Sequence, residues 1–148
     1  IGAGSAGLVS AYIAAAVQAK VILIEKHKMG GDCLNTGCVP SKALIRAAKY
    51  VHQITQAEKY GMKSASVSFE FADIMRRVHK VIEQIEPHDS IERYTELGVE
   101  VIQGAATLTS PYSVEVNGQT LTARNIIIAA GAQPFVPPIK GIDTIRPL

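Results

Sequence analysis

The sequence predicts an α/β domain that combines a parallel β-sheet with a smaller antiparallel β-meander. Three observations support this: closely spaced glycines in residues 1–7 precede an alanine-rich helical run, short apolar segments occupy 20–24 and 124–131, and hydrophobicity takes a period of two from residue 99. Fully apolar segments of this length suit buried parallel strands, whereas alternation suits antiparallel strands with one solvated face. We therefore expect a Rossmann-like parallel sheet with a meander attached.

The composition indicates one soluble globular domain. The 148 residues are 47% apolar and 19% charged, and 15 basic against 13 acidic residues give a net charge of +2. This balance argues against disorder and against a nucleic-acid surface. Residues 1–19 carry no charge, but they lack a basic leader and include polar residues, so we expect a buried helix and neither a signal peptide nor a membrane span. Because the first residue is Ile1 and no closing element is visible before Leu148, we expect a piece of a longer, cytoplasmic protein.

The first seven residues, Ile-Gly-Ala-Gly-Ser-Ala-Gly, form a dinucleotide-binding fingerprint. We expect Gly2 to make the turn from a strand, Gly4 to let the backbone approach a pyrophosphate, and Gly7 to let the helix pack closely. The free N–H groups at the helix start then face the phosphates. Glu25 ends the next apolar segment, 18 residues after Gly7, near the spacing at which a carboxylate accepts hydrogen bonds from a ribose. The alternative for Glu25 is an ordinary solvated charge at a strand end.

Helices and short strands are predicted for the middle of the chain. Good helix formers continue behind the second cysteine to about Glu58. Apolar residues then recur at helical spacing from 71 to 97, with a break at Pro87. Short segments with strand character follow, and Asn117-Gly118 is a strong hairpin turn between two of them. The meander is predicted at 99–102, 105–109, 113–116 and 119–122, and a central parallel strand at 124–131.

Both cysteines lie within residues 30–42, Gly-Gly-Asp-Cys-Leu-Asn-Thr-Gly-Cys-Val-Pro-Ser-Lys. In a regular helix the Cα atoms of Cys33 and Cys38 would be about 8.6 Å apart, beyond the roughly 7 Å limit for a disulfide, so a bridge needs distorted backbone. Gly37 can supply unusual dihedral angles. The helix start and the cation of Lys42 both favour thiolates. Spacing alone leaves open a redox pair, a structural bridge, half of a zinc site or two unrelated thiols.

Residues 30–42 closely resemble the redox-active disulfide motif of the flavin-dependent pyridine nucleotide-disulfide oxidoreductases, the family of dihydrolipoamide dehydrogenase, glutathione reductase and mercuric reductase. Asp32 stands where members usually have Thr, and Thr36 where they usually have Val. Residues 128–134 resemble the second flavin motif, with Ala130 in place of the usual Thr. The resemblance covers essentially the whole chain. It implies that residues 1–148 are the N-terminal part of an FAD-binding domain, with the NAD(P)-binding and dimer-interface domains outside them.

The resemblance also implies an enzyme in which NAD(P)H reduces FAD and the flavin reduces a Cys33–Cys38 disulfide. The dithiol then acts on a small-molecule disulfide, dithiol or metal-ion substrate, as in mercuric reductase or dihydrolipoamide dehydrogenase. Cys38 would face the flavin, Cys33 would attack the substrate, and Lys42 would stabilise negative charge beside the flavin. The four histidines match no catalytic base of the family. The full-length protein is expected to be a homodimer, and the piece alone to be inactive.

Cofactor contacts are implied for the two glycine-rich motifs, the strand end, the redox segment and the backbone near residue 104. They are Gly2, Gly4, Ser5, Ala6, Gly7, Glu25, Lys26, Gly31, Asp32, Cys33, Gly37, Cys38, Lys42, Gly104, Ala105, Ala130 and Gly131. Two other functional classes are weighed against this one. The first is a flavoprotein oxidase or monooxygenase with structural cysteines, and the second is a free-standing thiol or metal-binding module. Two cysteines without a nearby third ligand make a poor zinc site, so no metal site is expected.

Overall fold

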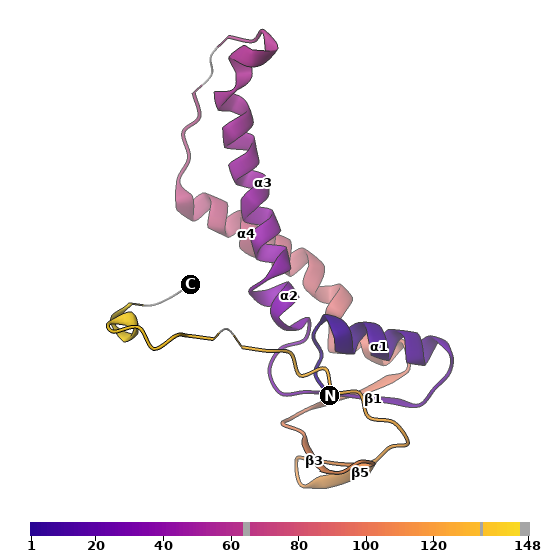
Figure 1. The fold of residues 1–148 in the computed structure, drawn as a ribbon. Coiled ribbons are helices and arrows are strands. Elements are labelled where there is room, and N and C mark those ends of the chain that lie inside the picture. Colours follow the sequence, from indigo (N-terminus) through magenta and orange to yellow (C-terminus); the bar gives the residue numbers. More distant parts are fainter. Residues whose placement is uncertain (64–65, 134, 146–148) are drawn as a thin grey trace.

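Figure 1 shows the fold as a computed structural model, which describes residues 1–63, 66–133 and 135–145. The α-helices are α1 (Ser5–Ala16), α2 (Gly31–Asn35), α3 (Cys38–Thr55), α4 (Phe71–Ile85) and α5 (Ile91–Glu96), with 3₁₀ turns η1 (Ala57–Tyr60), η2 (Glu86–Asp89) and η3 (Ile142–Thr144). The strands are β1 (Val21–Glu25), β2 (Val99–Gln103), β3 (Thr107–Ser110), β4 (Ser113–Val116) and β5 (Gln119–Thr122). This α/β arrangement of a parallel and an antiparallel sheet confirms the predicted fold class.

The parallel sheet pairs β1 with β2, in a register that runs from Val21 opposite Val99 to Glu25 opposite Gln103. The assignment of residues 99–102 to the meander is therefore wrong. Helices α2 to α5 separate the two strands and return the chain in the same direction, as a parallel pairing requires. Val99 is 1% exposed and packs in one cluster with Leu8 of α1, so burial of this side chain holds β2 beside β1.

The segment after the meander lies beside residue 1. The nitrogen of Ile1 donates to the carbonyl of Ile127 at 2.8 Å, and the N–H of Ala129 donates to the carbonyl of Ile1 at 2.8 Å. Two bonds to a single residue do not make a strand ladder, so the prediction of a strand over 124–131 is wrong in the described structure. The chain nevertheless passes beside the N-terminus there (Figure 1).

The meander is a three-stranded antiparallel sheet in the order β3-β4-β5. Asn117 and Gly118 join β4 to β5 with φ angles of +50° and +74°, which confirms the predicted hairpin turn. Val114 and Val116 on β4 are buried with Ile24 of β1 in a second core cluster. The meander is therefore packed on the parallel sheet through one apolar face.

Helix α1 approaches the turn before it at backbone distance. A Cβ on Gly7 would lie 1.7 Å from the carbonyl oxygen of Gly2, so no side chain fits at residue 7 without a shift. Gly2 itself has a φ of +99°, a conformation that L side chains rarely adopt. A Cβ there would lie 2.2 Å from the carbonyl oxygen of Ala129. Both glycine roles predicted from the fingerprint, the turn and the close helix packing, are confirmed.

Helices α3 and α4 pack on each other and extend away from the sheets (Figure 1). Helix α3 ends at Thr55, short of the predicted Glu58, and continues as η1. The helical stripe that begins at 71 breaks at η2, which contains Pro87, and resumes as α5, as predicted. Within the described residues, no helix has both the length and the apolar character that a membrane span requires.

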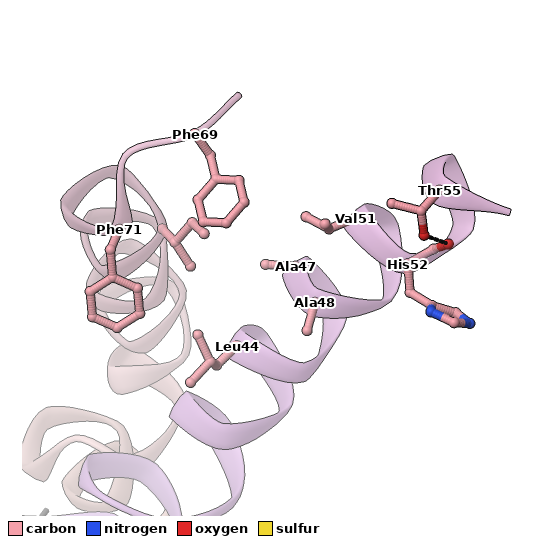
Figure 2. A pocket seen from close by; sticks show the side chains of 9 residues that line it. Leu44, Ala47, Ala48, Val51, His52, Thr55, Phe69 and Phe71 are labelled. Atoms are coloured by element: carbon pink, nitrogen blue, oxygen red, sulfur yellow. Dashed lines mark hydrogen bonds between the residues drawn. The ribbon is translucent and has the colours of Figure 1, made fainter. Parts of the chain in front are cut away.

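An open apolar groove of about 480 Å³ lies between α3 and the start of α4. Figure 2 shows Leu44, Ala47 and Val51 of α3 on one side, with Phe69 and Phe71 on the other. Phe69 is 53% exposed and Phe71 is 62% exposed, so this part of the helical pair contributes little to the core. The tight packing of the molecule is found around α1, β1 and β2.

Replacement of Gly7 by Ala should destabilise the protein by about 1–3 kcal/mol or more, because the added Cβ forces α1 away from the Gly2 turn. Gly4→Ala is the matched control, since its added Cβ meets nothing closer than 3.8 Å and its cost is expected to stay below about 1 kcal/mol. Urea unfolding measures both changes. Equal unfolding midpoints for the two variants would contradict the packing argument.

Candidate active site

The two cysteines lie on successive helices. Cys33 is in the short helix α2, and Cys38 is the first residue of α3. Between them the backbone leaves the helical region at Gly37, with φ −107° and ψ −105°. This confirms that the pair does not share one regular helix and that it lies where a loop enters a helix. Both thiols are free, and Cys33 is half-buried whereas Cys38 is exposed.

The two thiols differ in acidity because they interact with each other. Hydrogen bonds with Cys38 and then Ser5 lower the pKa of Cys33, burial opposes them, and the charge of Lys42 adds a smaller lowering. The same hydrogen bond and the negative charge on Cys33 raise the pKa of Cys38, and Lys42 lowers it by less. The expectation that Lys42 favours both thiolates is thus confirmed, but at Cys38 the interaction with Cys33 outweighs it, and the effect of the helix start stays a prediction. Cys33 is the first of the pair to ionise.

The start of α1 lies next to the thiol pair, because Ser5 is the first residue of that helix. The first helical bond runs from the N–H of Leu8 to the carbonyl of Gly4 at 2.9 Å, so the N–H groups of residues 5–7 precede the ladder and are available to an anion. A Cβ on Gly31 would lie 2.6 Å from the Cα of Gly4. Gly4 and Gly31 place backbone without side chains beside the start of α1, which fits a cofactor with a pyrophosphate.

Glu25 is a buried carboxylate at the end of β1, with 9% exposure. Its Oε2 accepts a hydrogen bond from the N–H of Ala3 at 2.6 Å, and its Oε1 accepts one from the N–H of His27 at 2.7 Å. The alternative of a solvated strand-end charge is therefore wrong. Each oxygen has a further lone pair with which to accept a hydroxyl. The role in ribose binding stays a prediction.

Gly104 follows β2, and its N–H donates to the carbonyl of Glu25 at 2.9 Å. A Cβ on Gly104 would lie 2.5 Å from Oδ1 of Asn117. The Nδ2 of Asn117 in turn donates to the carbonyl of Gln103 at 2.9 Å. The sequence predicted Asn117 as a turn residue but missed this second role, which joins the meander to the end of the parallel sheet. The structure thus shows a packing reason for glycine at 104.

The remaining predicted residues lie around the same edge of the parallel sheet. The Cα of Ala130 would be 3.2 Å from a Cβ on Gly2, which places the second motif against the first. Lys26 and Ala105 are exposed and directly follow Glu25 and Gly104. The four histidines are also exposed, at His27, His52, His79 and His88. The predicted site residues of both motifs are therefore brought together.

In the reduced protein, iodoacetamide should alkylate Cys33 before Cys38 when the pH lies below the ordinary thiol pKa, because the thiolate is the reactive form. Lys42→Met should slow the alkylation of Cys33, since the cation lowers its pKa. Peptide mass spectrometry at timed quenches measures the order. Preferential labelling of Cys38 in this pH range would contradict the assigned acidity.

The sequence pattern of the pyridine nucleotide-disulphide oxidoreductases matches residues 1–147. The chain is 33% identical over 145 residues to a mercuric reductase of Bacillus cereus, covering 98% of this chain and 23% of that protein. It is 36% identical over 143 residues to a dihydrolipoyl dehydrogenase of Acholeplasma laidlawii, covering 96% of this chain and 42% of that protein. Among solved structures, the HOCl-induced flavoprotein disulfide reductase RclA from Escherichia coli superposes with a TM-score of 0.77 at 28% identity, over 97% of this chain and 30% of that one. The glycine turn, the paired thiols and these matches together show that the chain belongs to the pyridine nucleotide-disulphide oxidoreductase family, which uses FAD and NAD(P)H.

Proposed function

We propose that residues 1–148 form the N-terminal part of the FAD-binding domain of a flavoprotein disulfide oxidoreductase, with Cys33 and Cys38 as its redox pair. The observation that carries this proposal is the placement of the two cysteines on successive helices beside the start of α1, where Gly31 meets Gly4 and a dinucleotide phosphate would bind. Cysteines with only a structural role would not require a position beside the start of α1. The NAD(P)-binding and dimer-interface domains would lie outside the chain, and the complete protein would be a cytoplasmic homodimer.

Residues on α1 and at the end of β1 would hold the pyrophosphate and the ribose of FAD. The N–H groups at residues 5–7 would bind the pyrophosphate, and the carboxylate of Glu25 would accept hydrogen bonds from the ribose. The backbone near Gly104, which donates to the carbonyl of Glu25, would contact the adenosine, and the backbone near Gly131 would contact the flavin. When bound, the flavin supplies a two-electron connection between NAD(P)H and the disulfide.

The acidity of the two thiols supports their assigned roles. Reduction of the Cys33–Cys38 bond by two electrons and two protons gives two thiols, and Cys33 then loses its proton first. Its thiolate attacks one sulfur of a substrate disulfide, forms a mixed disulfide and releases the first substrate thiol. The Cys38 thiolate next attacks the sulfur of Cys33, releases the second substrate thiol and re-forms the intramolecular bond. Lys42 lowers the pKa of both thiols, so it favours each attacking form.

The substrate class is a small disulfide or dithiol, or a metal ion that binds to thiolates. The proposal rests on the chemistry of two adjacent thiols, which exchange with disulfides and ligate soft metal ions. The printed names of the similar proteins fall into the same classes, with a mercuric reductase, a dihydrolipoyl dehydrogenase and a flavoprotein disulfide reductase among them.

In the complete protein, Cys38→Ser should leave FAD bound but abolish reduction of a disulfide or metal ion, because the thiol that faces the flavin is lost. Partial reduction of the parent protein with NAD(P)H should give a long-wavelength thiolate-to-flavin band in the visible spectrum. Cys33→Ser is the matched control, which should keep this band while losing turnover. Full activity of Cys38→Ser, or flavin bleaching without the band in the parent, would contradict the proposal and favour an oxidase with structural cysteines.

Replacement of Glu25 by Ala should weaken FAD retention. It removes the proposed ribose acceptor and leaves the buried N–H of Ala3 without its partner, which costs about 1–3 kcal/mol, and it also removes the part-buried bond from His27. Glu25→Gln is the control that keeps an acceptor oxygen and should lose less flavin. Flavin absorbance after dialysis measures retention, and circular dichroism verifies that the dialysed variants are folded. Unchanged flavin content in Glu25→Ala would contradict the proposed contact.

A further inference from the structure

Asp32 organises the backbone between the two cysteines. Its carbonyl oxygen accepts hydrogen bonds from the N–H of Thr36 at 2.9 Å and from the N–H of Gly37 at 2.7 Å. These two bonds end α2 and turn the chain toward Cys38. The path of the loop from one sulfur to the other therefore depends on the residue that precedes Cys33.

The side chain of Asp32 acts on the same loop. Its Oδ1 accepts a hydrogen bond from the hydroxyl of Thr36. Its Oδ2 would lie 3.0 Å from a Cβ on Gly37, so the carboxylate rests against the residue that precedes Cys38. The carboxylate of Asp32 is thus engaged within the redox loop, and its predicted contact with the cofactor stays a prediction.

Asp32 and Thr36 are also the two positions at which this loop departs from the usual motif of its family, with Asp for Thr and Thr for Val. The structure brings the two departures into contact. A valine has no hydroxyl to donate, so a Thr and Val pair cannot form this bond. The two residues that differ from the usual motif, Asp32 and Thr36, are thus the two partners of one hydrogen bond.

The interaction is described with the sulfurs of Cys33 and Cys38 unbonded, a loop geometry that suits the dithiol. Closure of a disulfide brings the sulfurs to about 2.05 Å and restrains the Cα separation to about 4.4–6.8 Å. An interaction that fixes the loop around separate thiols stabilises the reduced form relative to the closed form, and stabilisation of the reduced form makes a couple more oxidising.

We infer that Asp32 and Thr36 are a positioning pair that holds the Cys33–Cys38 loop in its dithiol geometry and so raises the reduction potential of the couple. This inference rests on the proposed redox function. Neither residue touches the reacting sulfurs in this role. Each acts through the loop backbone, and the effect is therefore expected in the equilibrium between dithiol and disulfide.

The experiment is a redox titration of the complete flavoprotein, with its cofactor bound, in dithiothreitol buffers. Two electrons and two protons pass from dithiothreitol to the Cys33–Cys38 bond, so the buffer ratio at half reduction reports the equilibrium constant. Acid quenching, alkylation and mass spectrometry count the free thiols directly and require no substrate turnover. The variants are Thr36→Val, Asp32→Ala, the corresponding double variant, and Asp32→Asn as the conservative change.

Thr36→Val and Asp32→Ala should each shift the equilibrium toward the disulfide by about tenfold, which corresponds to about 30 mV for a two-electron couple. The double variant should shift it no further than either single variant, because both remove the same interaction. Asp32→Asn should restore most of the parent value, since its amide oxygen still accepts the Thr36 hydroxyl.

Equal constants for Thr36→Val and the parent protein would overturn the inference, and so would a shift in Asp32→Asn as large as that in Asp32→Ala, which would assign the effect to charge. Both results leave the proposed function standing. Failure of the parent protein to form the disulfide at any buffer ratio would instead overturn the proposed function together with this inference.

Discussion

A buried carboxylate requires hydrogen-bond donors, and Glu25 finds two of them in the backbone on either side of β1. One donor is in the glycine turn that leads into α1, and the other is in the loop that leads toward α2. The strand end, the turn and the loop are therefore held in one arrangement. This single side chain thus joins the segment that leads to Ser5 of α1 with the segment that leads to Cys33 of α2.

The two thiols lie in one loop but differ in pKa. The hydrogen bond between Cys33 and Cys38 shifts the pKa of the two thiols in opposite directions, so Cys33 ionises more readily than Cys38. Two chemically identical side chains thereby differ in acidity because of their surroundings. The helix start that assists Cys33 through Ser5 also presents N–H groups suited to a phosphate, so the proposed redox chemistry and cofactor binding would lie within one turn of helix.

Local patterns predicted much of this arrangement, and non-local pairing accounts for most of the errors. The glycine spacing, the Asn117-Gly118 turn and the break at Pro87 each follow from the dihedral preferences of one or two residues. The parallel partner of β2 does not, because the alternation of Val99, Glu100 and Val101 is typical of an antiparallel strand, whereas the pairing with β1 depends on the helices between the two strands. The contact of Asp32 with Thr36 escaped prediction for a related reason, since an irregular loop has no period from which to infer facing side chains.

The approach of Gly7 to Gly2 also has a genetic consequence. Any missense change of a glycine codon adds at least a Cβ, and the space for a Cβ at residue 7 is already filled by the carbonyl oxygen of Gly2. Asp32 and Thr36 are exposed, so replacement of either changes an interaction and not the space available. Residue 7 is thus constrained by space, whereas Asp32 and Thr36 are constrained only by the interaction between them. In a library of random variants, Gly7 should keep its ancestral residue longer than Asp32 or Thr36.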